Sequence, residues 1–243
     1  MSTIEIYALI GIIVFLAGFT QGLSGFGSIL LSLPLLAIFL DIKSVIPLVA
    51  LIGLCITIIL FIQLWRHLDW RKLCPLFLGA LPGIPIGVFL LKKLDQGSIQ
   101  WILGVILVTY SLYSLFFPSM NKGIHEGWAY LFGFFTGVIG GALSAPGPAA
   151  IVYTSLQNWS KDTMKVTLQG IFLVAFSSSV LFHALSGITT AAVFRCFLVS
   201  MPFLFLGTYA GSLFYGRIRE ADYKRVVLVL LALLGMFMIY LAM

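Results

Sequence analysis

The chain has 243 residues, of which 61% are hydrophobic and only 9% are charged, whereas about a quarter of the residues in a soluble domain are charged. Its apolar stretches are continuous, as in residues 226–243, which excludes a transmembrane β-barrel with its alternating apolar and polar positions. The formal net charge of +6 comes from basic residues in short loops, as the positive-inside rule expects. We therefore predict an all-α polytopic membrane protein that binds no nucleic acid.

The sequence carries no pattern typical of an enzyme or a metalloprotein. Its three cysteines, Cys55, Cys74 and Cys196, are scattered without metal-ligand spacing, and we expect them in apolar packing. A phosphate-binding loop, a nucleophile elbow and a zinc-binding motif are all missing from the sequence. We predict a protein that is not an enzyme and that has no cofactor and no metal site.

Ten apolar segments lie between the charged residues, glycines and prolines that interrupt the chain. The first five are residues 4–22, 28–40, 44–65, 73–91 and 98–117. The second five are residues 127–141, 146–158, 163–185, 191–215 and 223–243. We predict a helix in each segment.

Two of these segments are too short to cross a membrane. A bilayer core of about 30 Å requires about 20 helical residues, and the last three segments of each half satisfy this length. Segments 28–40 and 146–158 have 13 residues each, or about 20 Å at 1.5 Å per residue. They fit half-helices that end near the middle of the membrane, and each half therefore contains a broken or re-entrant helix pair followed by three transmembrane helices.

A duplicated glycine stretch relates the two halves. Residues 18–27 contain four glycines, and a distorted copy occupies residues 133–148. Gly18, Gly22 and Gly25 correspond to Gly133, Gly137 and Gly140 at a constant offset of 115, and Gly83 and Gly87 correspond to Gly207 and Gly211 at an offset of 124. This duplication predicts an N-terminal repeat (1–117), a cytoplasmic connecting loop (118–126) and a C-terminal repeat (127–243).

The loop charges predict the orientation of these repeats. When the segments alternate across a bilayer, 10 of the 14 basic residues fall on one side, which is then cytoplasmic. The other four are Lys43, Lys92, Lys93 and Arg195. Both termini are then outside, the first short pair opens outward, and the second opens inward. The two repeats are therefore expected to be inverted, as in many secondary transporters.

Several short motifs occur in a recognisable order along the chain. They are Gly18-Phe19 through Gly27, Pro34-Leu35, Leu81-Pro82-Gly83 with Gly87, and, in the second half, Gly133-Phe134, Gly137 and Gly147-Pro148. This order resembles the TauE/SafE sulfite exporter family of integral membrane proteins over nearly the whole chain. The resemblance implies export or uptake of sulfite, of sulfonates such as sulfoacetate, or of related organic acids across the cytoplasmic membrane.

The glycine breaks are the candidate binding site. The two half-helices begin near residues 27–28 and 146–148, and a helix start has unpaired N–H groups and a partial positive charge that bind anions. Both starts are expected to meet near the middle of the membrane, in a site without permanent charge. The predicted substrate-binding residues are Gln21, Ser24, Gly25, Phe26, Gly27, Ser28, Thr136, Gly140, Ser144, Pro146, Gly147 and Gln169. The alternative is that the glycines serve close helix packing.

Charged side chains contribute little else to the predicted path. All eight acidic residues fall in loops or at segment ends, so the sequence indicates no buried carboxylate for proton or sodium coupling. His183 is either a proton-linked gate or a packed histidine. Arg195 either attracts anions into an outer vestibule or extends to the membrane interface. Gln169 either contacts the substrate or ties helices together.

Together these features predict a secondary transporter of small anions that works by alternating access between inverted halves. Two alternatives remain open, an anion channel with a filter of helix ends and a membrane subunit that does not transport. The expected partners are a small anionic substrate and the lipid bilayer, and homo-oligomerisation is left open. The sequence also leaves open whether each short pair is a full or a re-entrant hairpin.

Overall fold

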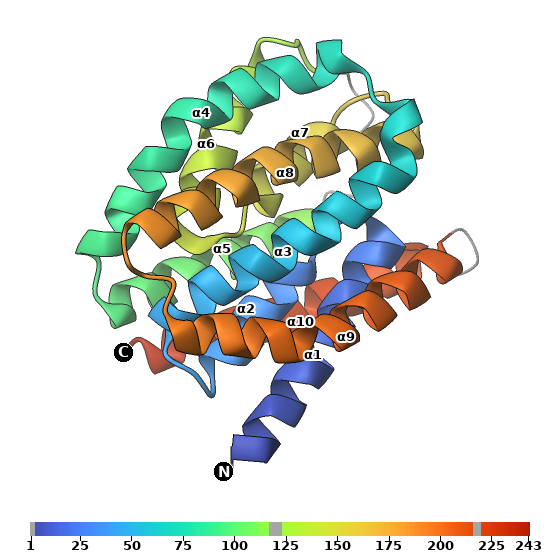
Figure 1. The fold of residues 1–243 in the computed structure, drawn as a ribbon. Helices are drawn as coiled ribbons and strands as arrows, with labels where there is room; N and C mark the ends of the chain where they lie inside the picture. Colours follow the sequence, from blue (N-terminus) through green and yellow to red (C-terminus); the bar gives the residue numbers. More distant parts are fainter. Residues whose placement is uncertain (1–2, 117–122, 216–219) are drawn as a thin grey trace.

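A computed structural model describes residues 3–116, 123–215 and 220–243, and these residues form helices without a β-strand (Figure 1). The first half contains α1 (Thr3–Ser24), α2 (Ser28–Ala37), α3 (Ile42–Leu64), the 3-10 turn η1 (Trp65–His67), α4 (Trp70–Lys93) and α5 (Gln96–Phe116). The second half contains α6 (Trp128–Leu143), α7 (Gly147–Ser155), α8 (Lys161–Leu185), α9 (Ala191–Phe214) and α10 (Glu220–Leu241). The all-α prediction is confirmed.

The helix boundaries follow the predicted segments closely. Each segment coincides with one helix, and no end differs by more than three residues. Six helices in the described part of the chain are long and apolar enough to span a membrane: α1, α3, α4, α5, α8 and α9. By contrast, α2 has 10 residues and α7 has 9, which is about 15 Å or less. The two helices that follow the glycine breaks are therefore as short as predicted.

The main helix pairs join one half of the chain to the other. The most extensive packing is between α4 and α6, between α1 and α9, and between α5 and α10. Helices α3 and α8 also contact each other and lie side by side across the middle of Figure 1. Exchanging each helix for its counterpart in the other half leaves this pairing unchanged, as expected of a duplicated fold. The inverted orientation of the halves in a membrane stays a prediction.

Glycines spaced four residues apart make two of these pairs unusually close. On α4 and α6, a Cβ atom added at Gly83 would overlap the carbonyl oxygen of Phe134, and one added at Gly137 would overlap that of Ala80. On α1 and α9, the same holds for Gly22 against the carbonyl oxygen of Thr208. Small residues at this spacing let two membrane helices approach backbone to backbone. The packing interpretation therefore accounts for the earlier part of each glycine stretch.

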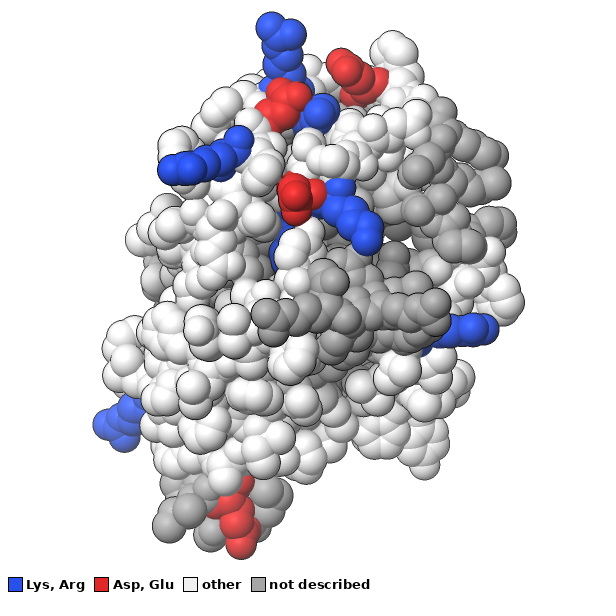
Figure 2. Space-filling model, turned by 90° about the vertical axis from the view of Figure 1, so that its right-hand side faces the viewer, with Lys and Arg blue, Asp and Glu red and all other residues white. Residues whose placement is uncertain are grey.

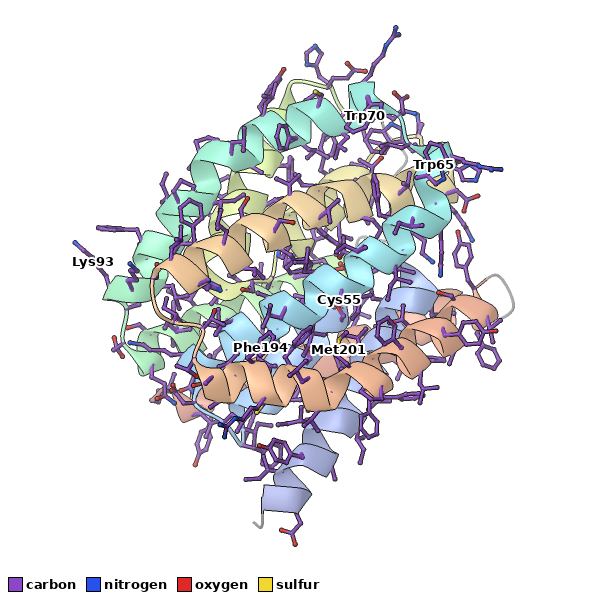
Figure 3. The ribbon with its side chains drawn as sticks, in the orientation of Figure 1. Cys55, Trp65, Trp70, Lys93, Phe194 and Met201 are labelled. Atoms are coloured by element: carbon purple, nitrogen blue, oxygen red, sulfur yellow. The ribbon has the colours of Figure 1, made fainter. Side chains whose placement is uncertain are left out.

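Aromatic and charged residues mark the ends of the helices. Trp65 and Trp70 are 59% and 67% exposed at the turn from α3 to α4, and Lys93 lies at the far end of α4 (Figure 3). Exposed tryptophans at helix ends are typical of anchors at a membrane interface. Figure 2 shows one face of the molecule, where charged side chains gather in the upper part and most of the remaining surface is uncharged.

Some residues used to predict the orientation lie outside the described part of the chain. These are Lys122, Arg217 and Arg219, together with most of the connecting loop 118–126. The described end of that loop contacts the end of α7, where the Gly123 N–H donates to the Leu156 carbonyl over 3.0 Å. The repeat boundaries and the location of the termini stay predictions.

Candidate functional site

The two breaks meet at one small cavity in the interior. It has a volume of about 10 Å³, which is room for about one water molecule. Its wall combines the start of α2 with the residues that lead into α7, although these segments belong to different halves. The lining residues are Gln21, Gly27, Ser28, Ile29, Leu30, Ala145, Pro146, Gly147, Phe172 and Phe176.

The starts of α2 and α7 differ from those of three long helices. Asp69, Ser160 and Thr190 each accept a backbone N–H at the start of α4, α8 and α9, over 3.1, 3.2 and 3.3 Å. Gly27 and Pro146 occupy the same position before α2 and α7, and neither forms a side-chain cap. The first N–H groups of these two half-helices therefore face the cavity without competition from a capping side chain.

The backbone of the first break requires glycine at two positions. Gly25 and Gly27 have φ values of 84° and 96°, in the left-handed region that glycine adopts without steric cost. They turn the chain from the end of α1 into α2. Ser24 bonds locally, since its hydroxyl lies 2.7 Å from the Thr20 carbonyl oxygen and 2.8 Å from that of Phe26. Ser24 and Phe26 line a second cavity against α10 and lie outside the lining of the first.

The second break turns with a serine instead of a glycine. Ser144 has a φ of 52° and is the one non-glycine residue with positive φ in the described part of the chain. Its side chain is fully buried and its hydroxyl has no hydrogen-bond partner. One turn earlier, the Gly140 carbonyl accepts a 3.1 Å hydrogen bond from Ser179 of α8. The two breaks therefore reverse direction by different local means.

A pair of buried glutamines connects the first break to α8. The Gln169 amide donates to the Gly25 carbonyl oxygen over 2.5 Å, and its own carbonyl accepts from the Gln21 amide over 3.1 Å. The Gln21 amide also lies 3.3 Å from the Thr57 hydroxyl of α3, and the Gln21 carbonyl accepts from Ser28. Gln21 and Gln169 are 1% and 0% exposed. Sequence reasoning missed Thr57, which nothing in its apolar surroundings distinguishes.

The other predicted residues lie apart from the first cavity. The Thr136 hydroxyl donates to the Phe132 carbonyl within its own helix over 2.7 Å. Arg195 is exposed near the start of α9. His183 is fully buried in α8, and neither ring nitrogen has a hydrogen-bond partner.

Lys165 corrects the expectation of a site without permanent charge. The sequence interpretation placed this residue in the loop before the eighth segment, whereas it lies in the second turn of α8 and is only 5% exposed. Its ammonium donates to the Gly22 carbonyl over 2.9 Å and lies 3.7 Å from the centre of the Tyr215 ring. A signal was available, because Lys165 and Gln169 are four residues apart and therefore share a helix face.

Comparison with known proteins agrees with the helical architecture and the paired breaks. The family described as Sulfite exporter TauE/SafE matches residues 10–238. The chain belongs to this family. The TauE/SafE match includes both breaks, both glutamines and Lys165, and it makes the chain a multi-pass membrane transporter and not an enzyme.

Two relatives have printed descriptions that agree with the family. A "Probable sulfite/organosulfonate exporter TauE" of Cupriavidus necator is 25% identical over 174 residues, which are 70% of this chain and 68% of the relative. A "Probable inner membrane transporter protein TsaS" of Comamonas testosteroni is 25% identical over 175 residues, which are 71% of this chain and 73% of the relative. No solved structure matches the chain.

Proposed function

We propose that this protein is a secondary transporter of small oxyanions of the sulfite and organosulfonate type, with its substrate site at the cavity between α2 and α7. One observation carries the proposal: two half-helices, one from each half, begin without side-chain caps at the same cavity. Helix starts of this kind bind anions through N–H groups and the helix dipole. The substrate class follows from the descriptions of the family and of its relatives.

The residues around the cavity suit an oxyanion that binds and then leaves. Ile29 and Leu30 occupy the first turn of α2 and line the cavity, so their N–H groups are available as donors. The Ser28 hydroxyl bonds to the Gln21 carbonyl and can turn toward an anion instead. Phe172 and Phe176 form the apolar wall, which excludes water and strengthens the remaining polar contacts.

The described conformation is closed around this site. A cavity of about 10 Å³ holds no more than about one water molecule, so a sulfite ion needs the helices to separate. The closely packed pairs α1–α9 and α4–α6 each combine one helix from each half. We therefore propose that alternating access moves these two pairs relative to each other, with α2 and α7 carried at their ends.

Transport measured in proteoliposomes tests the proposed function. Purified protein should mediate saturable counterflow of labelled sulfite, and an excess of unlabelled sulfite or sulfoacetate should compete. Large currents that do not saturate would indicate an anion channel. A failure to move any of these oxyanions would contradict a transport role and favour a subunit that scaffolds other proteins.

A substitution at the start of α7 tests the site. A Cβ atom added at Gly147 would lie 3.2 Å from the Ile151 side chain and 3.8 Å from that of Leu30, so a small side chain fits. The branches of the valine in Gly147→Val occupy the cavity, and this variant should lose sulfite counterflow while remaining folded. The matched control is Ala149→Val on the same helix, outside the cavity lining. Equal counterflow in both variants would refute the site.

A further inference from the structure

Lys165 is a buried cation next to the first break. It lies one turn inside α8 and is 5% exposed, although a lysine inside a membrane span is costly and usually marks a functional path. Its stem packs against Gly25, because a Cβ atom added there would lie 2.6 Å from the Lys165 Cγ. The side chain therefore extends along the backbone of the break.

The ammonium is held by contacts that an anion can replace. It donates to the Gly22 carbonyl over 2.9 Å, which is among the last carbonyls of α1 and at the negative end of that helix. It also lies 3.7 Å from the centre of the Tyr215 ring. A carbonyl and a ring face each carry only partial negative charge, so a full anion is a stronger partner for the same ammonium.

Tyr215 and Asp162 complete a link between three helices at this point. The Tyr215 hydroxyl, just after α9, donates to the Asp162 carboxylate over 2.8 Å. Asp162 lies in the first turn of α8, three residues before Lys165. The contacts of Lys165 therefore connect α8 to the α1–α9 pair, which is one of the two units that must separate for the site to open.

The same helix face leads from Lys165 to the cavity. Gln169 lies one turn further along α8 and donates to Gly25, while Lys165 donates to Gly22. Gln169 also bonds to Gln21, which lines the cavity. An anion that leaves the cavity along α8 thus passes from the glutamine pair to the ammonium within one helical turn.

We propose that Lys165 is a substrate-binding residue of the transport path, at which a sulfite-type oxyanion replaces the Gly22 carbonyl and so releases α8 from the α1–α9 pair. This inference rests on the proposed function and adds to it a specific charged group. The alternative role is structural, in which the lysine only caps the last carbonyls of α1. The two roles differ in their effect on substrate affinity.

Three variants separate charge from capping. Lys165→Gln retains a donor for the Gly22 carbonyl and removes the charge, whereas Lys165→Arg retains the charge. The control is Lys161→Gln, which makes the same change on an exposed residue one turn earlier in α8. Sulfite counterflow in proteoliposomes gives KM and maximal rate for each variant, and thermal stability in detergent is measured on the same samples.

For Lys165→Gln we expect KM for sulfite to rise about 10- to 100-fold, the loss typical of one hydrogen bond to a charged group. Lys165→Arg and Lys161→Gln should remain within about threefold of the wild type, which is less than the loss of one such bond. An unchanged KM in Lys165→Gln, with or without a loss of stability, would assign Lys165 to capping and overturn the inference. Absence of counterflow in the wild type would instead overturn the proposed function, and this inference with it.

A measurement on the wild type covers the case in which Lys165→Gln does not fold. Protein labelled with 15N-lysine gives side-chain ammonium resonances, and Lys165→Arg assigns the one that belongs to Lys165. Addition of sulfite should shift this resonance in a saturable manner. A Lys165 resonance that does not move at sulfite concentrations that saturate transport would overturn the inference.

Discussion

Gln169 offers the most informative single position, because one residue supports both the structure of the break and its charge. Its amide donates to the Gly25 carbonyl over 2.5 Å and its carbonyl accepts from the Gln21 amide over 3.1 Å. Gln169→Leu removes both hydrogen bonds without adding charge. Gln169→Glu retains the size and places a carboxylate where an anion is expected to pass.

The magnitudes of the two effects differ. Buried side-chain hydrogen bonds in membrane proteins average about 0.6 kcal/mol and reach about 1.7 kcal/mol, so the leucine variant should lose about 1–3 kcal/mol of stability. Two like unit charges about 4–8 Å apart repel by about 2–4 kcal/mol at an effective dielectric constant of about 20. This repulsion corresponds to about a 30- to 700-fold loss of affinity.

The assay is KM for sulfite in proteoliposomes, normalised to the wild type at each pH. The order should be wild type, then Gln169→Leu, then Gln169→Glu. Because burial raises the pKa of the introduced carboxyl group, the defect of the glutamate variant should deepen as the pH rises. Gln63→Glu, on the exposed end of α3, is the matched control and should behave as the wild type. Equal KM values in the leucine and glutamate variants would refute an anion site at the first break.

Three further predictions concern the scaffold. Gly137→Leu should prevent assembly of the α4–α6 pair, because its side chain overlaps the Ala80 carbonyl, and size-exclusion chromatography should show aggregated protein; a stable monodisperse variant would contradict the packing. Thr190→Ala removes the cap of α9 and should cost about 1 kcal/mol, seen as a lower melting temperature with unchanged KM; a lower affinity would argue against a purely structural cap. Cysteines at Arg71 and Lys93, at opposite ends of α4, should react with an impermeant reagent from the cytoplasmic and the outer side respectively; the reverse result would contradict the predicted orientation.

The helix boundaries could be predicted because each apolar segment ends at charged or helix-breaking residues, and the short segments 28–40 and 146–158 stand out by length alone. The roles of the glycines could not be separated in the same way. Gly22 and Gly25 look alike in the sequence, yet Gly22 lies against the backbone of α9 and Gly25 turns the chain at a φ of 84°. Which role applies depends on the partner helix.

The pairing of the helices and the environment of Lys165 also lay beyond the sequence. Glycine spacing indicates close packing but does not say that α1 pairs with α9 and α4 with α6, across the two halves. Lys165 follows two polar turns, so it was assigned to a loop. Its burial arises because the end of α1 lies beside the start of α8 and supplies the Gly22 carbonyl, a contact between residues far apart in the sequence.

The central claim is that a small oxyanion binds between the starts of α2 and α7, and direct localisation of an anion tests it most sharply. Selenite is a close chemical analogue of sulfite, and selenium can be located by anomalous scattering in crystals of the protein. We predict one saturable selenium site between Ser28 and Gly147, within about 3–4 Å of backbone N–H groups, as expected for hydrogen-bonded selenite oxygens. Selenium density elsewhere, with this cavity empty in crystals of protein that transports selenite, would contradict the account.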